Sequence, residues 1–180
     1  QRQVAEVEVM ALRSQMNPHF IFNCLNSLKH FIIANEVKLG ATYVNKFSKL
    51  VRMILEHTER TLVLLSEDWE ALCAYVDLEQ MRFEDRLTVS YEVAPGLLRS
   101  GLQIPPLLVQ PYVENAIRHG LLNKEGPGQL RIVLRRTEGR LHYTIEDDGV
   151  GRAYAQELRQ NSVLSRRSLG MTLGDRKSVV

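Results

Sequence analysis

The spacing of the apolar residues changes near residue 83 of this chain, and the change limits the folds that the chain can adopt. Up to about residue 83, apolar residues recur every three or four positions, which is typical of amphipathic helices. Beyond that point apolar and polar residues alternate over 87–93, which predicts a strand that ends at Pro95. We therefore expect an α+β protein in which a helical segment precedes a region of interleaved helices and strands.

The helical segment is expected to contain three helices. The first runs to about Ile32, and after a short break a second carries apolar residues at helical spacing as far as Leu55. The third begins at Ser66, which two acidic residues follow as a helix start signal, and it ends near Phe83. Two helices with one apolar face each bury those faces poorly alone, so residues 1–62 are predicted to form a dimeric four-helix bundle.

The region after the first strand is expected to hold one more helix and two more strands. The helix is predicted over 107–121, and the strands over 130–136 and 141–146, with a turn at Gly139 between them. Residues 63–180 are therefore expected to fold as a two-layer α/β sandwich.

Composition excludes several classes of protein. The chain has 180 residues, of which 44% are apolar, and its 23 basic and 21 acidic residues leave a net charge of +2. This balance argues against direct binding to nucleic acid. Cys24 and Cys73 both lie among apolar residues and are read as reduced core residues. No apolar run approaches the roughly 18 residues that span a bilayer, and the chain begins within a helical pattern, so we expect it to be a fragment of a longer protein.

Pro18 stands directly before His19 in the first helical segment, and two interpretations are open. A proline at the first position of a helix is inexpensive, whereas a proline in the interior costs roughly 3 kcal/mol and kinks the helix. Beyond it, one face of the helix is apolar, with Ile21, Cys24, Leu25, Leu28 and Ile32. A second face is polar but nearly uncharged, with His19, Asn23, Asn26 and His30. We interpret Pro18 as a kink that displays His19, with the apolar face holding the dimer.

Two polar motifs later in the chain are candidates for chemistry. The helix over 109–121 carries four polar residues within six positions: Glu114, Asn115, Arg118 and His119. They are either a solvated face with an ion pair between residues 114 and 118, or a binding surface. The segment EDDGVG follows a predicted strand, and it is either a common turn or a nucleotide site. In the second case Asp147 accepts a hydrogen bond from an exocyclic amine, and Gly149 and Gly151 allow close approach of the ligand.

Together these motifs carry a family resemblance. ENAIRHG followed by DDGVG resembles the N-box and first glycine box of the GHKL superfamily of ATPases, which have the Bergerat fold. QMNPHFIFNCLNSL, LEQMRFEDRL and IPPLLVQPYVENAIRHGL resemble, more narrowly, the LytS/YehU-type sensor histidine kinases. The resemblance extends from about Leu12 to Leu173. It implies ATP and Mg²⁺ as cofactors.

The resemblance assigns roles to individual residues. It implies that His19 is the phosphoacceptor, that Asn115 coordinates the magnesium ion on the ATP phosphates, and that Asp147 reads the adenine amine, with Gly149 and Gly151 lining the pocket. Arg118 and His119 lie on the N-box helix and are candidate phosphate contacts. The segment 168–173 resembles the start of the second glycine box, with Gly170 in the lid over the phosphates.

Two departures from the family pattern bear on the reaction. Hydrolysing members carry a water-activating glutamate four residues before the N-box asparagine, and Pro111 stands there. This favours phosphoryl transfer over hydrolysis and makes a gyrase-like or chaperone-like ATPase the least favoured function. Many histidine kinases place an acid directly after the phosphoacceptor, where this chain has Phe20, so Glu114 is the candidate general base. The last six residues, 175–180, back-translate into a sequencing-adapter sequence, and we expect the ATP-binding domain to be incomplete.

The resemblance implies a complete reaction and a set of partners. The chain is expected to autophosphorylate His19 with ATP and to pass the phosphoryl group to an aspartate of a DNA-binding response regulator. It is expected to be a homodimer and the cytoplasmic portion of a bacterial sensor anchored in the inner membrane by a region outside this sequence. The alternative is a non-catalytic dimeric signalling module with a decayed or incomplete ATP site.

Overall fold

The computed structural model describes residues 18–83, 86–121, 124–150 and 177–179, with side chains for all of them except Pro18, His19, His119 and 177–179. The chain forms two compact units. The first contains Gln1–Arg82 and Gly101–Leu108, and the second contains Phe83–Ser100 and Val109–Val180.

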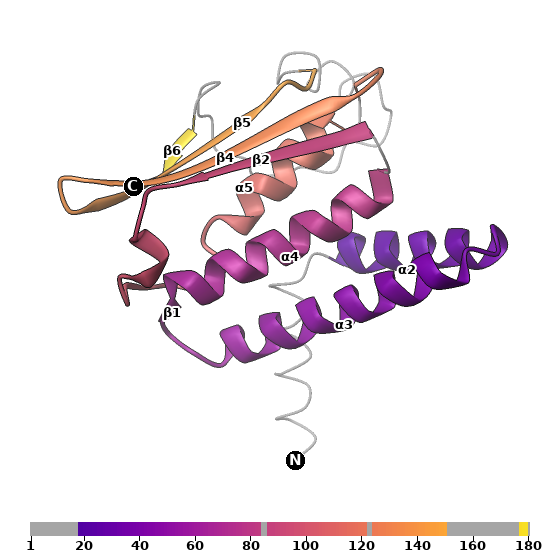
Figure 1. Ribbon diagram of the computed structural model, residues 1–180, viewed down its shortest axis with the longest axis horizontal. Coiled ribbons are helices and arrows are strands. Elements are labelled where there is room, and N and C mark those ends of the chain that lie inside the picture. The colour runs from indigo at the N-terminus through magenta and orange to yellow at the C-terminus, as the bar shows by residue number, and fades with distance from the viewer. Residues whose placement is uncertain (1–17, 84–85, 122–123, 151–176, 180) are drawn as a thin grey trace, which may run out of the picture. The chain divides into compact units, whose positions relative to one another are not determined.

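The first unit is built on three helices and a short ladder. Helices α2 (Pro18–Ile33) and α3 (Val37–Thr58) run side by side in opposite directions, and α4 (Leu65–Phe83) follows them (Figure 1). Strand β1 (Val63–Leu64) pairs antiparallel with β3 (Gln103–Ile104). All three predicted helices are present. The residues before α2 lie outside the described part of the chain, so the kink at Pro18 stays a prediction.

The core of the first unit is aromatic where α2, α3 and α4 meet. The Phe20 ring lies with its centroid 5.1 Å from that of Tyr75 and 6.4 Å from that of Phe47. Cys24 is a free thiol that is hydrogen-bonded to the Tyr43 hydroxyl. Burial raises the pKa of the Cys24 thiol to about 11. A neutral buried thiol is chemically inert, as expected for a reduced core cysteine.

The buried face of α2 differs in part from the apolar face read from the sequence. Its buried side chains are Phe20, Cys24, Ser27 and Phe31. Two members of the predicted face, Leu25 and Ile32, are instead 51% and 70% exposed. The helix is apolar over more than one arc, and periodicity alone does not say which arc packs inside the chain. The second apolar arc of α2, which includes Leu25 and Ile32, is exposed on the surface of the first unit.

The second unit is a mixed four-stranded sheet with helical segments. Its strands are β2 (Leu87–Val93), β4 (Gly128–Thr137), β5 (Arg140–Asp147) and β6 (Lys177–Val179), in the order β2-β4-β5-β6. Strands β2 and β4 are parallel, and the other pairs are antiparallel. The β4–β5 turn is at Glu138 and Gly139, both with positive φ, as the sequence predicts. Strand β6 lies in the segment 175–180, and its pairing does not bear on the predicted origin of that segment.

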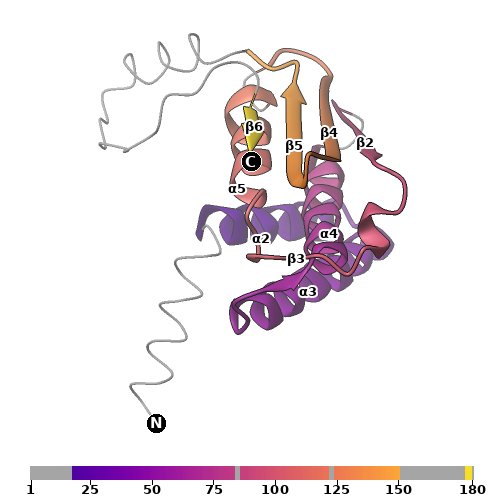
Figure 2. The same ribbon diagram turned by 90° about the vertical axis from the view of Figure 1, so that its left-hand side faces the viewer.

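The helical segment over residues 110–121 lies on one face of this sheet. The 3₁₀ turn η2 (Leu97–Arg99) precedes α5 (Gln110–Asn115), which continues into the π-helical segment η3 (Ala116–Leu121). Helix α5 lies along the sheet beside β5 (Figure 2). The apolar residues of this layer are buried on both sides: Val113, Ile117, Leu121, Leu130, Ile132 and Leu134. The α+β class is therefore confirmed.

Two expectations about the second unit differ in detail from the structure. The predicted helix over 107–121 begins only at Gln110, because Leu107 is in the left-handed region with φ of 57°. From Ala116 the helix widens to π geometry, which the apolar pattern does not reveal. Among the described residues, no helix combines the length and hydropathy needed to cross a membrane.

Candidate functional site

The N-box segment supplies the polar side chains of the candidate site. Glu114 and Arg118 form an ion pair, with Arg118 Nη1 donating to Glu114 Oε1 at 3.3 Å, and both side chains are largely buried. The plainer interpretation of these two residues, an i,i+4 pair, is thus present in the structure. Asn115 ends α5 with its side chain exposed. Its amide is accessible to a ligand.

Widening of the helix falls within the motif itself. Residues Ala116–Leu121 of η3 include Arg118 and His119, and the side chain of His119 lies outside the description. Short π-helical turns occur frequently at functional sites because they re-aim side chains that a regular helix would space evenly. The segment that follows Asn115 is therefore locally irregular where Arg118 and His119 are candidate phosphate contacts.

The two motifs meet at Gly120, which ends the segment ENAIRHG. A Cβ added to Gly120 would lie 2.2 Å from Asp147 Oδ1, and one added to Gly149 would lie 2.2 Å from the Gly120 carbonyl carbon. The Val150 N–H donates to the Gly120 carbonyl oxygen at 3.2 Å, and the Gly149 N–H donates to Asp147 Oδ1 at 3.1 Å. Both glycines are required by this close backbone approach.

The two adjacent aspartates of EDDGVG have different surroundings. Asp148 pairs with Lys124 Nζ at 2.7 Å and accepts a hydrogen bond from the Gln129 N–H at 2.7 Å. Burial raises the pKa of Asp148, but the Lys124 ammonium and the Gln129 N–H outweigh it and hold this pKa below its usual range. Asp148 therefore ties the loop to β4. Asp147, whose side chain is exposed as well, is the last residue of β5.

Several predicted site residues lie wholly or partly outside the described residues. His19 is in the first turn of α2, and its side chain is not described. Gly151 and Gly170 lie outside the described residues. His19 belongs to the first unit and Glu114 to the second, so the pairing of these two as nucleophile and base stays a prediction.

Sequence reasoning missed three residues that shape this site. Gly120 lies in ENAIRHG, and the resemblance implies no role for it, although a glycine within a helical pattern is costly and marks a close approach. Lys124 and Asp148 form an ion pair across a glycine-rich turn. The pairing of two charges 24 positions apart has no local sequence signal.

Comparisons with known proteins agree with the motifs. The histidine kinase family model matches residues 7–87. Sensor protein LytS of Enterococcus faecalis is 31% identical over 146 residues, which make up 81% of this chain and 24% of that protein. Sensor histidine kinase YesM of Bacillus subtilis is 31% identical over 148 residues, 82% of this chain and 25% of that protein. YpdA of Escherichia coli, also a sensor histidine kinase, is 33% identical over 146 residues, 81% of this chain and 25% of that protein.

These matches place the chain among the histidine kinases of two-component signal transduction. Within that class its relatives are sensor kinases of the LytS type, and the resemblance drawn from the motifs is confirmed. The chain spans about a quarter of the length of these curated relatives.

Proposed function

We propose that this chain is the core of an ATP-dependent protein histidine kinase that phosphorylates His19 and passes the phosphoryl group to an aspartate of a response regulator. The observation that carries the proposal is the contact of Gly120 with Asp147 and Gly149, which joins the N-box segment to the DDGVG loop. Residues 1–62 would supply the dimerisation and phosphotransfer helices, and residues 63–180 the ATP-binding domain of Bergerat type.

The residues present fit an adenine nucleotide with magnesium. Asp147 offers an exposed carboxylate to the adenine amine, and Gly120 leaves the space in which that carboxylate lies. Asn115 offers a neutral amide oxygen, which suits Mg²⁺ because this ion takes few protein ligands and keeps phosphate and water oxygens. ATP supplies the γ-phosphoryl group when it is bound. Gly149, Gly151 and Gly170 would let backbone N–H groups approach the nucleotide.

In the proposed transfer, His19 is the nucleophile. A bond forms between a ring nitrogen of His19 and the γ-phosphorus as the bond to the bridging oxygen breaks, and ADP leaves. The ring proton would pass to Glu114. Arg118, now paired with Glu114, and His119 would offset charge on the phosphates. In the second step the P–N bond breaks and a P–O bond forms on the aspartate of the response regulator.

Pro111 supports transfer over hydrolysis. It lies in the first turn of α5, where its ring presents no carboxylate to activate water. In this proposal the γ-phosphoryl group is therefore kept for His19, and the nucleotide is hydrolysed slowly in the absence of an acceptor.

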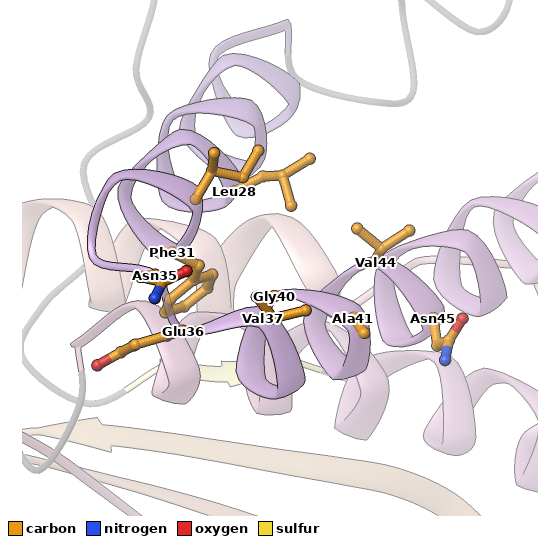
Figure 3. Close-up of a pocket in the computed structure, with 10 residues that line it drawn as sticks. Leu28, Phe31, Asn35, Glu36, Val37, Gly40, Ala41, Val44 and Asn45 are labelled. Carbon is orange, nitrogen blue, oxygen red and sulfur yellow. The ribbon is translucent and has the colours of Figure 1, made fainter.

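A dimer is supported by the apolar surface that α2 and α3 leave exposed. Leu25, Ile32 and Val37 expose 51%, 70% and 74% of their surfaces. Ile32 and Val37 also line an open pocket of about 510 Å³, together with Leu28 and Phe31 of α2 and Gly40 and Val44 of α3 (Figure 3). Apolar surface of this kind marks an interaction site. The same hairpin of a second copy would cover it and complete a four-helix bundle.

The location of the chain and its partner protein follow from the proposed reaction. We place the chain on the cytoplasmic side of a bacterial inner membrane, where ATP and a response regulator are available, with the sensor and anchor in a region outside this sequence. The regulator is proposed to bind DNA.

The proposal is tested on the full-length protein. Calorimetry should show binding of ATP that is tighter with Mg²⁺ than with a chelator, and incubation with γ-labelled ATP should give acid-labile, alkali-stable phosphoprotein. An isolated receiver domain of the regulator should then remove the label. If the protein binds no nucleotide and gains no label, the non-catalytic signalling module is the better account.

A further inference from the structure

We infer that Asp68 is a positioning residue for this kinase: it fixes the backbone at Leu107, from which the chain enters the N-box helix. The inference rests on the proposed function, because it concerns how the residues that hold the Mg²⁺-bound phosphates are placed.

Asp68 is a buried carboxylate with one strong hydrogen bond. It lies in the first turn of α4 and is 4% exposed. Its Oδ1 accepts a hydrogen bond from the Leu107 N–H at 2.6 Å. A bond between an N–H and an ionised carboxylate is roughly twice as strong as one between neutral groups, so this contact is a firm attachment for the backbone.

The Leu107 N–H is the first backbone donor after the β1–β3 ladder. Ile104 pairs with Val63 in that ladder, and Pro105 and Pro106 have no N–H group. Leu107 itself has φ of 57°, a left-handed conformation that is strained for a residue with a branched side chain. Such a conformation persists only where the surroundings impose it, and the bond to Asp68 is a contact that holds the Leu107 backbone in place.

Leu107 determines how the next helix starts. Helix α5 begins three positions later at Gln110, and Asn115 is its last residue. The N-cap of α5 is Val109, which makes no side-chain hydrogen bond to the first turn. The start of α5 has no side-chain cap of its own, so the backbone just before it decides where the first helical turn can begin.

Asp68 also interacts electrostatically with His57, at the end of α3. His57, in the last turn of α3, is 4% exposed, and its charge favours the ionised form of Asp68, as does the Leu107 N–H. Burial outweighs both and raises the pKa of Asp68. A buried carboxylate is costly, and an apolar residue of the same shape would avoid that cost. Asp68 thus interacts electrostatically with the last turn of a predicted dimerisation helix and is hydrogen-bonded to the backbone that precedes the N-box helix.

In this proposal, two different segments of the chain recognise the phosphates and the adenine of the nucleotide. Asn115, for the phosphates and Mg²⁺, follows Leu107 closely in the chain, whereas Asp147, for the adenine, is carried by β5. Loss of the Asp68 contact should therefore weaken binding of Mg²⁺-ATP and slow transfer to His19. It should leave binding of ADP without Mg²⁺ within about twofold, because that ligand depends mainly on the adenine contact. Misplacement of a reacting group by about 1 Å can cost on the order of 100-fold in rate.

The test compares three variants of the full-length protein. Asp68→Leu keeps the branched shape of the side chain and removes the acceptor, and because it also removes a buried charge, it should fold. Asp68→Asn keeps an acceptor oxygen. Glu67→Gln is the matched control, since Glu67 lies in the same turn and accepts a hydrogen bond from the Leu64 N–H at 3.1 Å, away from Leu107.

Each variant is assayed for thermal unfolding, His19 phosphorylation rate against ATP concentration, and calorimetric binding of Mg²⁺-ATP and Mg²⁺-free ADP. Asp68→Leu should lose about tenfold or more in phosphorylation rate and in Mg²⁺-ATP affinity, with Asp68→Asn and Glu67→Gln within about twofold of the parent. Parental kinetics in Asp68→Leu, an Asp68→Asn variant as impaired as Asp68→Leu, or equal loss of both ligands would overturn the inference. An inactive parent that binds no nucleotide would overturn the proposed function instead.

Discussion

Gly120 approaches Asp147 so closely that a Cβ on residue 120 would lie 2.2 Å from the Asp147 Oδ1 atom. The two residues belong to different motifs and are 27 positions apart in the chain. Their contact means that the backbone of the N-box segment and the carboxylate of the glycine-box loop occupy adjoining space. The two motifs therefore form one site, and a substitution in one motif should alter the geometry of the other.

Gly120→Ala tests this contact. Alanine favours a helix over glycine by about 1 kcal/mol, so local propensity alone would predict a more stable protein. We expect instead that the added methyl group displaces the Asp147 carboxylate and lowers ATP affinity by about tenfold, a change of about 1.4 kcal/mol measurable by calorimetry. Gly40→Ala is the control, because its Cβ would meet Phe31 Cβ at an ordinary 3.4 Å. Equal ATP affinity in both variants would contradict the account.

Asp147 and Asp148 should differ when each is changed to asparagine. Asp147 Oδ1 already accepts a hydrogen bond from the Gly149 N–H. In Asp147→Asn the one remaining oxygen would stay with that N–H, and the NH2 donor would face the adenine amine, so ATP binding should weaken by about tenfold or more while stability changes little. Asp148→Asn loses the ion pair with Lys124. Because that pair is partly exposed, the loss in unfolding free energy should stay below about 1 kcal/mol, with ATP affinity retained. Urea unfolding and calorimetry separate the two effects, and an ATP defect confined to Asp148→Asn would reverse the assignment.

The pH dependence of stability should report on Asp68. Burial raises the pKa of Asp68 above its unfolded value, so the folded protein binds this proton more tightly than the unfolded chain does. Stability due to this group is therefore fully present below the unfolded pKa of about 3.9 and is lost as pH rises through the folded pKa. Asp68→Asn removes the titration.

Urea unfolding of the parent and Asp68→Asn at a series of pH values from about 4 upward measures this effect. The unfolding free energy of the parent should fall relative to the variant as pH rises and then level off. A constant difference across the series would show that Asp68 does not titrate differently in the folded and unfolded states.

The exposed arc of α2 should hold the dimer. Leu25→Glu places a charge on a side chain that is 51% exposed in the single chain, so the protomer should remain folded. In a bundle the same charge would be buried without a partner, and the dimer should weaken by about 100-fold or more. Leu62→Glu is the matched control, because Leu62 is 46% exposed and lies outside both helices. Sedimentation equilibrium that shows the same dimer in both variants would remove α2 from the interface.

Periodicity predicted the elements well because apolar spacing directly reflects burial. The helices before residue 83 and the turn at Gly139 are where the pattern and the turn residues place them. Periodicity did not identify which arc of α2 packs inside the chain, since Cys24 and Leu25 are equally apolar in sequence but only Cys24 is buried.

The site was predictable only as far as its motifs are local. The residue types of ENAIRHG and DDGVG suggest a ligand, but the approach of Gly120 to Gly149 depends on how two segments pack. The same holds for Asp68, whose partner Leu107 lies 39 positions away. Contacts of this kind leave no periodic trace, and a buried carboxylate within an ordinary helix start signal looks like any other capping acid.

The central claim is that ATP bound at the joined motifs phosphorylates His19. The most direct measurement is incorporation of label from γ-labelled ATP, with Mg²⁺, into the full-length protein and into His19→Gln and His30→Gln. His30 is the matched control because it is another histidine of α2, with its side chain exposed. The account predicts acid-labile label in the parent and in His30→Gln and none in His19→Gln. Label that persists in His19→Gln, or that disappears only in His30→Gln, would contradict it.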